Sequence, residues 1–134
     1  MTPAAPPDVF EYATVRVVPR VEREEFLNVG VVLLCRTRGF LGARFAPVSG
    51  ERLRAFVGPE FDAADLAARL HAIERICAGR REGGPIGQLG LAERFRWLTA
   101  ARSTVVQMSA VHPGLCAGEP TAVLERLFGE LVGS

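Results

Sequence analysis

The residues best suited to chemistry stand within a segment that is otherwise strongly apolar, Tyr12–Cys35. Arg16 interrupts the first apolar run, Glu25 ends a charged connection, and Asn28 lies near the start of the second run. A guanidinium beside a carboxylate or an amide can bind a ligand carboxylate or phosphate, with the glutamate as base or metal ligand. The same residues can instead form an arginine–carboxylate pair that fixes the register of two strands. The sequence favours the register pair and keeps the ligand site as its alternative.

A second polar group follows in the consecutive residues Arg102, Ser103 and Thr104, with Gln107 three positions later. A guanidinium, two hydroxyls and the exposed N–H groups of a strand start can together hold a phosphate. Hydroxyl residues at the start of a strand also serve as ordinary turn caps, and this is the role that we expect here. Gln107 would share a strand face with Ser103, where it could contact a polar ligand or be an exposed edge residue.

His112 lies in the irregular segment SAVHPGLC and could act as a general acid or base near neutral pH. No spacing specifies a Ser/His/Asp or Cys/His arrangement with it, so a hydrogen-bonding loop residue is favoured. The three cysteines, Cys35, Cys77 and Cys116, form no CxxC pair, which predicts reduced thiols and neither a metal site nor a cofactor. Together these residues favour a protein that is not an enzyme.

Length and charge limit the class of protein. The 134 residues fit one domain, which we expect over residues 9–134 after a disordered, Pro- and Ala-rich lead at residues 1–8. The formal net charge of +1 argues against a nucleic-acid binder, although all 16 basic residues are arginine. The longest apolar run, Val29–Cys35, is too short to cross a bilayer, and the first residues do not form a signal peptide. The sequence therefore predicts a cytoplasmic protein that does not contact a membrane.

The elements that must position these residues follow from hydrophobic periodicity and from turn residues. The near-continuous apolar run at Val29–Cys35 predicts a central strand that is buried on both faces. Ser49 and Asp62 stand where the first two helices would be capped. Strands are expected at residues 9–18, 26–35, 40–46 and 103–108, and helices at 51–56, 63–78, 91–100 and 120–132. The predicted class is α+β, with a mostly antiparallel sheet of about four strands packed on one face by three to four helices.

Three segments carry a resemblance to a known family: YATVRVVPRVEREEFLNVGVVL, ERFRWLTAARSTVVQMSAVHPGL and LERLFGELV. In order and spacing they resemble the bacterial domain-of-unknown-function family DUF3037. The resemblance covers nearly the whole chain after the lead. Relatives are often encoded beside a HipA-like kinase, so the resemblance implies a two-gene module. It implies no established activity and no site residues.

These observations lead to a first hypothesis and two alternatives. The first is a non-enzymatic binding or regulatory module whose partner is the HipA-like kinase. The second is a small enzyme or ligand-binding domain for a phosphorylated or carboxylate metabolite, in which Arg16, Arg102 and His112 converge in one pocket. The third is nucleic-acid binding through a locally Arg-rich face. The sequence leaves open a homodimer formed through an unpaired sheet edge.

Overall fold

The computed structural model describes residues 8–79, 81–102, 104–116 and 118–133. Its strands form one antiparallel sheet in the order β3-β2-β1-β4, and β5 pairs with β1 as well. The long strand β1 is shared along its length, because its first half pairs with β5 and its second half with β4. The strands are β1 (Asp8–Val17), β2 (Leu27–Cys35), β3 (Phe40–Phe45), β4 (Val106–Met108) and β5 (His112–Cys116).

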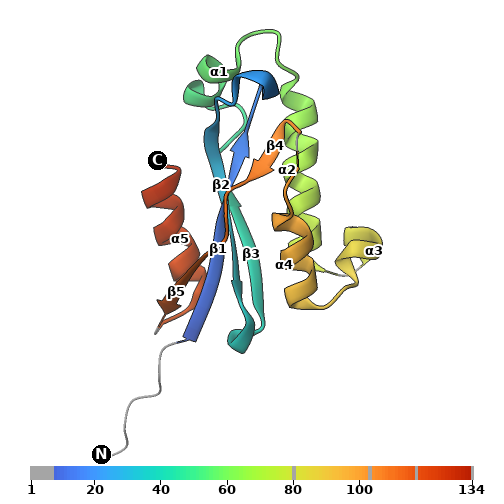
Figure 1. The fold of residues 1–134 in the computed structure, drawn as a ribbon, viewed down its shortest axis with the longest axis vertical. Coiled ribbons are helices and arrows are strands. Elements are labelled where there is room, and N and C mark those ends of the chain that lie inside the picture. Colours follow the sequence, from blue (N-terminus) through green and yellow to red (C-terminus); the bar gives the residue numbers. More distant parts are fainter. Residues whose placement is uncertain (1–7, 80, 103, 117, 134) are drawn as a thin grey trace, which may run out of the picture.

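Helices cover both faces of this sheet (Figure 1). The helix α5 lies along one face, whereas α2 and α4 lie along the other (Figure 1). The helices are α1 (Glu51–Val57), α2 (Ala63–Ala78), α3 (Gly84–Gly87), α4 (Leu91–Thr99) and α5 (Pro120–Leu131). Short 3-10 turns occupy Val21–Arg23, Arg36–Arg38 and Arg81–Gly83. Among the described helices, none is long and apolar enough to cross a membrane.

The central strand β2 explains why both faces need cover. Its residues Val32 and Leu34 join the core beneath α2 and α4, whereas Val31 and Leu33 join a second core beneath α5. A strand with apolar side chains on both faces exposes one of them unless each face is packed. The α+β class and the antiparallel sheet are therefore confirmed. The expectation that helices pack on one face only is corrected, since α5 covers the second face.

A β-bulge in β2 brings two predicted site residues side by side. Val15 of β1 lies opposite Gly30, but the next residue, Arg16, lies opposite Asn28, so Val29 is the extra residue. Glycine suits position 30, because a Cβ there would lie against the ring of Phe45 and 2.8 Å from the backbone oxygen of Arg44. The extra residue turns Asn28 toward α5, where its side chain donates a hydrogen bond to a backbone oxygen of that helix.

Most predicted boundaries agree with the structure, but the strand expected at 103–108 begins only at Val106, and two further local expectations are wrong. The carboxylate of Asp62 caps α2 by accepting a hydrogen bond from the N–H of Asp65 at 3.0 Å. The residue that caps α1 is Gly50 and not Ser49. The sequence indicated an irregular segment at Pro113 and Gly114, because both are poor strand formers. The structure has the strand β5 there. An edge strand tolerates the proline, and the missing side chain of Gly114 leaves room for the ring of Phe10.

Candidate functional site

A small pocket lies where α2, α4 and β4 meet. Its volume is about 200 Å³. Trp97 and Arg102 line it from the end of α4 and the following segment, and Arg69 lines it from α2. The remaining apolar lining comes mainly from residues that also belong to the core or pack against it: Ile73, Ile76, Leu98 and Met108. We call this site the Trp97 pocket. It combines an apolar interior with cationic groups.

Arg102 is held in place by Trp97. The Cζ atom of Arg102 lies 4.1 Å from the centroid of the indole ring, and its Nη2 donates a hydrogen bond to the carbonyl oxygen of Trp97 at 2.7 Å. The stacked arrangement is a cation–π contact, which fixes the plane of the guanidinium. Trp97 is still 39% exposed. A tryptophan and an arginine are therefore presented to solvent in one fixed arrangement.

The two guanidinium groups of the pocket differ in their partners. The Nε of Arg69 donates to Oδ2 of Asp65 at 2.8 Å, an exposed pair one helical turn apart. No carboxylate makes an ion pair with Arg102 among the residues that the structure describes. Arg102 is therefore the cation of this pocket that can pair with an anionic group from another molecule.

The neighbouring polar residues have structural roles in the described part of the chain. Thr104 donates its hydroxyl proton to the carbonyl oxygen of Val106 at 2.6 Å, and Gln107 donates its amide to the carbonyl oxygen of Thr104 at 2.9 Å. Both residues also line the pocket. Ser103 lies outside the described residues. In the described part of this segment, the Thr104 hydroxyl is thus engaged with the backbone of its own segment.

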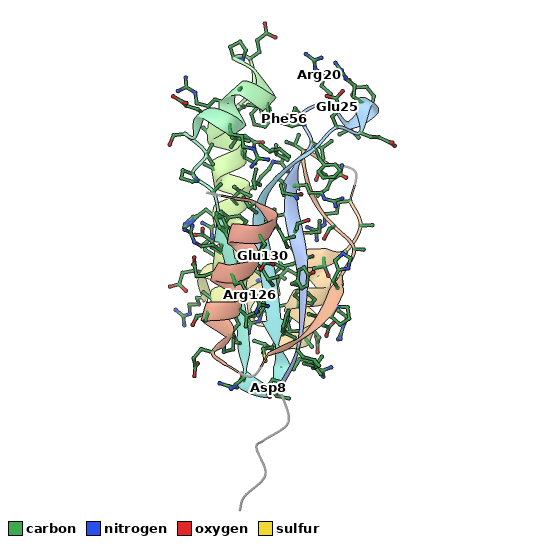
Figure 2. All side chains as sticks on the ribbon, turned by 90° about the vertical axis from the view of Figure 1, so that its left-hand side faces the viewer. Asp8, Arg20, Glu25, Phe56, Arg126 and Glu130 are labelled. Atoms are coloured by element: carbon green, nitrogen blue, oxygen red, sulfur yellow. The ribbon has the colours of Figure 1, made fainter. Side chains whose placement is uncertain are left out.

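Arg16, Glu25 and Asn28 lie away from this pocket. Glu25 is at the end of the molecule opposite Asp8, near Arg20 and Phe56 (Figure 2), and forms its ion pair with Arg23 at 2.7 Å. The expected pair between Glu25 and Arg16 is therefore not formed. Asn28 does lie directly opposite Arg16, as the pairing of β1 with β2 shows.

His112 and the two arginines of the metabolite hypothesis do not share a cavity. His112 is exposed in β5, where its ring centroid lies 5.5 Å from that of Tyr12, its cross-strand neighbour. Tyr12 precedes Arg16 by four strand positions, a separation of about 13 Å. Arg102 belongs to the opposite side of the sheet, with α2 and α4. The side chains that the alternative metabolite hypothesis required to converge thus lie on separate parts of the surface.

The other hollows and titratable groups of the described residues have these properties. A larger hollow of about 560 Å³ lies beside α1 and the start of α2, with Glu51 and Arg54 as its charged lining, so it has no preference for one sign of charge. Burial raises the pKa of the Cys77 thiol to about 12, which makes it a poor nucleophile. Hydrogen bonds from Thr37 and then Arg38 lower the pKa of Asp8. Within the described ranges, no group of three or more His, Cys, Asp or Glu side chains could hold a metal ion.

The sequence identified part of the Trp97 pocket and missed the rest. Arg102, Thr104 and Gln107 were among the predicted site residues, whereas Trp97 and Arg69 were not. The sequence signal that could have indicated Trp97 is the segment Phe95–Trp97, in which two aromatic residues flank an arginine. This segment ends five positions before Arg102. The contribution of α2 depends on tertiary packing and carries no local signal.

Comparison with known proteins gives a family and no activity. The model of a family described as a protein of unknown function, DUF3037, matches residues 12–132. No curated protein and no solved structure matches the chain.

Proposed function

This chain belongs to the DUF3037 family, and we propose that it is a non-enzymatic binding module that docks on a partner protein through the Trp97 pocket. The observation that carries the proposal is the exposed Trp97 with Arg102 stacked on it at the mouth of an apolar pocket. Tryptophan and arginine are the residue types that most often dominate the binding energy of protein interfaces.

The size of the pocket favours a protein partner over a metabolite. Sites for small molecules usually have volumes of about 300–1,000 Å³, and the Trp97 pocket has about 200 Å³. That volume suits one large apolar side chain of a partner. The separate positions of Arg16, Arg102 and His112 also argue against the single metabolite site that they were expected to form.

The charges of the pocket describe the partner's contact segment. Arg102 has no carboxylate partner within the described chain, so it is available to an acidic side chain. The partner therefore carries an apolar residue next to an aspartate or glutamate. We assign this role to the HipA-like kinase that the family resemblance implies, and we place the complex in the cytoplasm.

Co-expression with that kinase tests the proposal. We expect one peak in size-exclusion chromatography at micromolar concentration, and a calorimetric titration that gives one binding site. In Trp97→Ala the dissociation constant should rise by about 30-fold, the effect of losing roughly 2 kcal/mol at a dominant contact. Leu89→Ala is the matched control, because its exposed fraction of 37% is close to the 39% of Trp97 and it does not line the pocket.

A charge reversal tests the role of Arg102. Arg102→Glu should weaken binding at least as much as Trp97→Ala, because it places a carboxylate against the acidic residue of the partner. Arg126→Glu is the control: Arg126 lies on α5, on the opposite face of the sheet (Figure 2). Two separate peaks for the unmodified proteins would contradict the proposal. So would equal losses in both charge-reversal variants, or binding of an oligonucleotide in place of the kinase.

A further inference from the structure

A hollow of about 560 Å³ lies beside α1 and the start of α2, and the function proposed above does not use it. Sites for small molecules usually have volumes of about 300–1,000 Å³, a range that the Trp97 pocket does not reach and this hollow does. The two are separate, because none of the described residues lines both. We call this second site the α1 hollow. It lies at the end of the molecule remote from the start of β1 (Figure 1).

The interior of the α1 hollow is apolar. Val48, Val57 and Phe61 line it and also pack against the core beneath α2 and α4. Leu53 and Leu66, which line it as well, are buried members of that core. Core packing therefore holds the walls of the hollow in place, and an apolar group that enters it would remove apolar surface from water.

Two charged side chains of α1, Glu51 and Arg54, line the same hollow. They are three positions apart in the helix, so they are neighbours on its surface, with about 5–6 Å between their Cβ atoms. Both are exposed, and neither makes an ion pair among the described residues. Asp65 and Arg69 of α2 provide the comparison, because these two neighbours do pair, at 2.8 Å. The α1 hollow thus presents a carboxylate and a guanidinium that are both available to a ligand.

The two charges restrict the ligand. An anion without a cationic group would meet the carboxylate of Glu51, and a cation without an anionic group would meet the guanidinium of Arg54. Each of these ligands would therefore gain one favourable contact and suffer one repulsion. A ligand that carries a carboxylate and an ammonium on the same carbon atom satisfies both side chains. The apolar interior then requires that this ligand also has an apolar part.

We propose that the α1 hollow binds a free α-amino acid with a large apolar side chain. Arg54 holds its carboxylate and Glu51 holds its ammonium, while Val48, Val57 and Phe61 surround its side chain. The site does not depend on the function proposed for the Trp97 pocket, so each of the two proposals can fail without the other.

Titration of the full chain with L-phenylalanine, followed by the backbone amide resonances of the ¹⁵N-labelled protein, tests the site. Resonances of α1 and of the start of α2 should shift with a dissociation constant on the order of 1 mM, typical of a ligand with few atoms. N-acetyl-L-phenylalanine lacks the ammonium, and L-phenylalaninamide lacks the carboxylate. Each should bind about threefold to fivefold more weakly, the effect of losing one exposed ion pair. Glycine, which lacks the apolar part, should cause no shift there.

Two variants assign the charges. Arg54→Gln should weaken the binding of L-phenylalanine and of its N-acetyl derivative, but not that of the amide. Glu51→Gln should weaken the binding of L-phenylalanine and of the amide, but not that of the N-acetyl derivative. Arg75→Gln is the control, because Arg75 is an exposed arginine of α2 that does not line the hollow.

The three phenylalanine ligands are compared on the unmodified protein, so the proposal is still tested if a variant fails to fold. Equal affinity for L-phenylalanine and its amide would indicate that the hollow binds the N-terminal residue of a peptide. Equal affinity for all three ligands would indicate an apolar hollow that does not recognise charge. Either result would overturn the proposal, and so would the absence of shifts in α1 and α2.

Discussion

Ser109 joins the two short strands that share β1, and its loss should have a measurable effect on stability. It follows β4 and precedes β5, at the point where neither strand pairs with β1. Its Oγ accepts a hydrogen bond from the N–H of Thr14 at 2.8 Å, and its own N–H donates to the carbonyl oxygen of Thr14 at 2.9 Å. A serine side chain thus completes the hydrogen bonding of β1 across the gap between its two partners.

The magnitude of the effect follows from burial. Ser109 is 7% exposed and Thr14 is 6% exposed, so Ser109→Ala would leave the N–H of Thr14 buried without an acceptor. The cost of such an orphaned donor is about 1–3 kcal/mol. The second bond of the hydroxyl, to the carbonyl oxygen of Ala110 at 2.9 Å, adds little because Ala110 is exposed. We expect a loss of about 2 kcal/mol, or a decrease in Tm of roughly 6–8 °C for a chain of this length.

Urea unfolding monitored by circular dichroism and by the fluorescence of Trp97 gives the free energy of unfolding. Ser49→Ala is the control, because Ser49 is exposed and caps no helix, so its change should stay within about 0.5 kcal/mol. Amide hydrogen exchange of Thr14 should accelerate in Ser109→Ala more than that of the surrounding β1 residues. If Ser109→Ala costs no more than Ser49→Ala, the N–H of Thr14 has another acceptor and the argument is refuted.

Two further outcomes test the packing around the central strands. Gly30→Ala should destabilise the protein by about 1–3 kcal/mol, because its Cβ would lie 2.8 Å from the backbone oxygen of Arg44. Gly129→Ala, in the open part of α5, is the control and should be neutral or stabilising. Equal urea midpoints for the two variants would show that the bulge adapts to the added methyl group. Cys77 should resist iodoacetamide at pH 8 in the folded state and react in urea, since burial raises its pKa from 9.0 to about 12. Between pH 9 and pH 12 the thiol ionises in the unfolded chain only, so Cys77 should lower the stability of the fold as the pH rises through this range. Rapid labelling of the Cys77 peptide in the native protein, detected by mass spectrometry, would contradict the burial.

The elements that were predicted well are those whose signal is local. The apolar stripe of α2 and the capping residue Asp62 fixed that helix at Ala63–Ala78, as the structure has it. The apolar run of β2 also indicated burial on both faces, and the two cores confirm it. A strand that is buried on both faces needs a helix on each face of the sheet. The expectation of helices on one face only therefore conflicted with the burial expected for β2.

The parts that were missed depend on contacts between distant segments. Ser109 and Thr14 are 95 positions apart, and Asn28 and Leu131 are 103 apart. No periodicity within a window of residues reports such pairs. The bulge at Val29 also has no local signal. The pairing of β2 with β1 shifts by one residue there, but the apolar sequence continues without a break. The unusual polar residues Arg16 and Asn28 were visible in the sequence, but the register that places them opposite each other was not.

The strand β4 connects the Trp97 pocket to the long strand β1. Its central residue, Gln107, lies directly opposite Arg16 and also lines the Trp97 pocket. Among the described strands β4 pairs with β1, and its residues Val106 and Met108 also pack against the core beneath α2 and α4. A partner that docks on the Trp97 pocket, as we propose, would therefore meet a strand that β1 and the core hold in place.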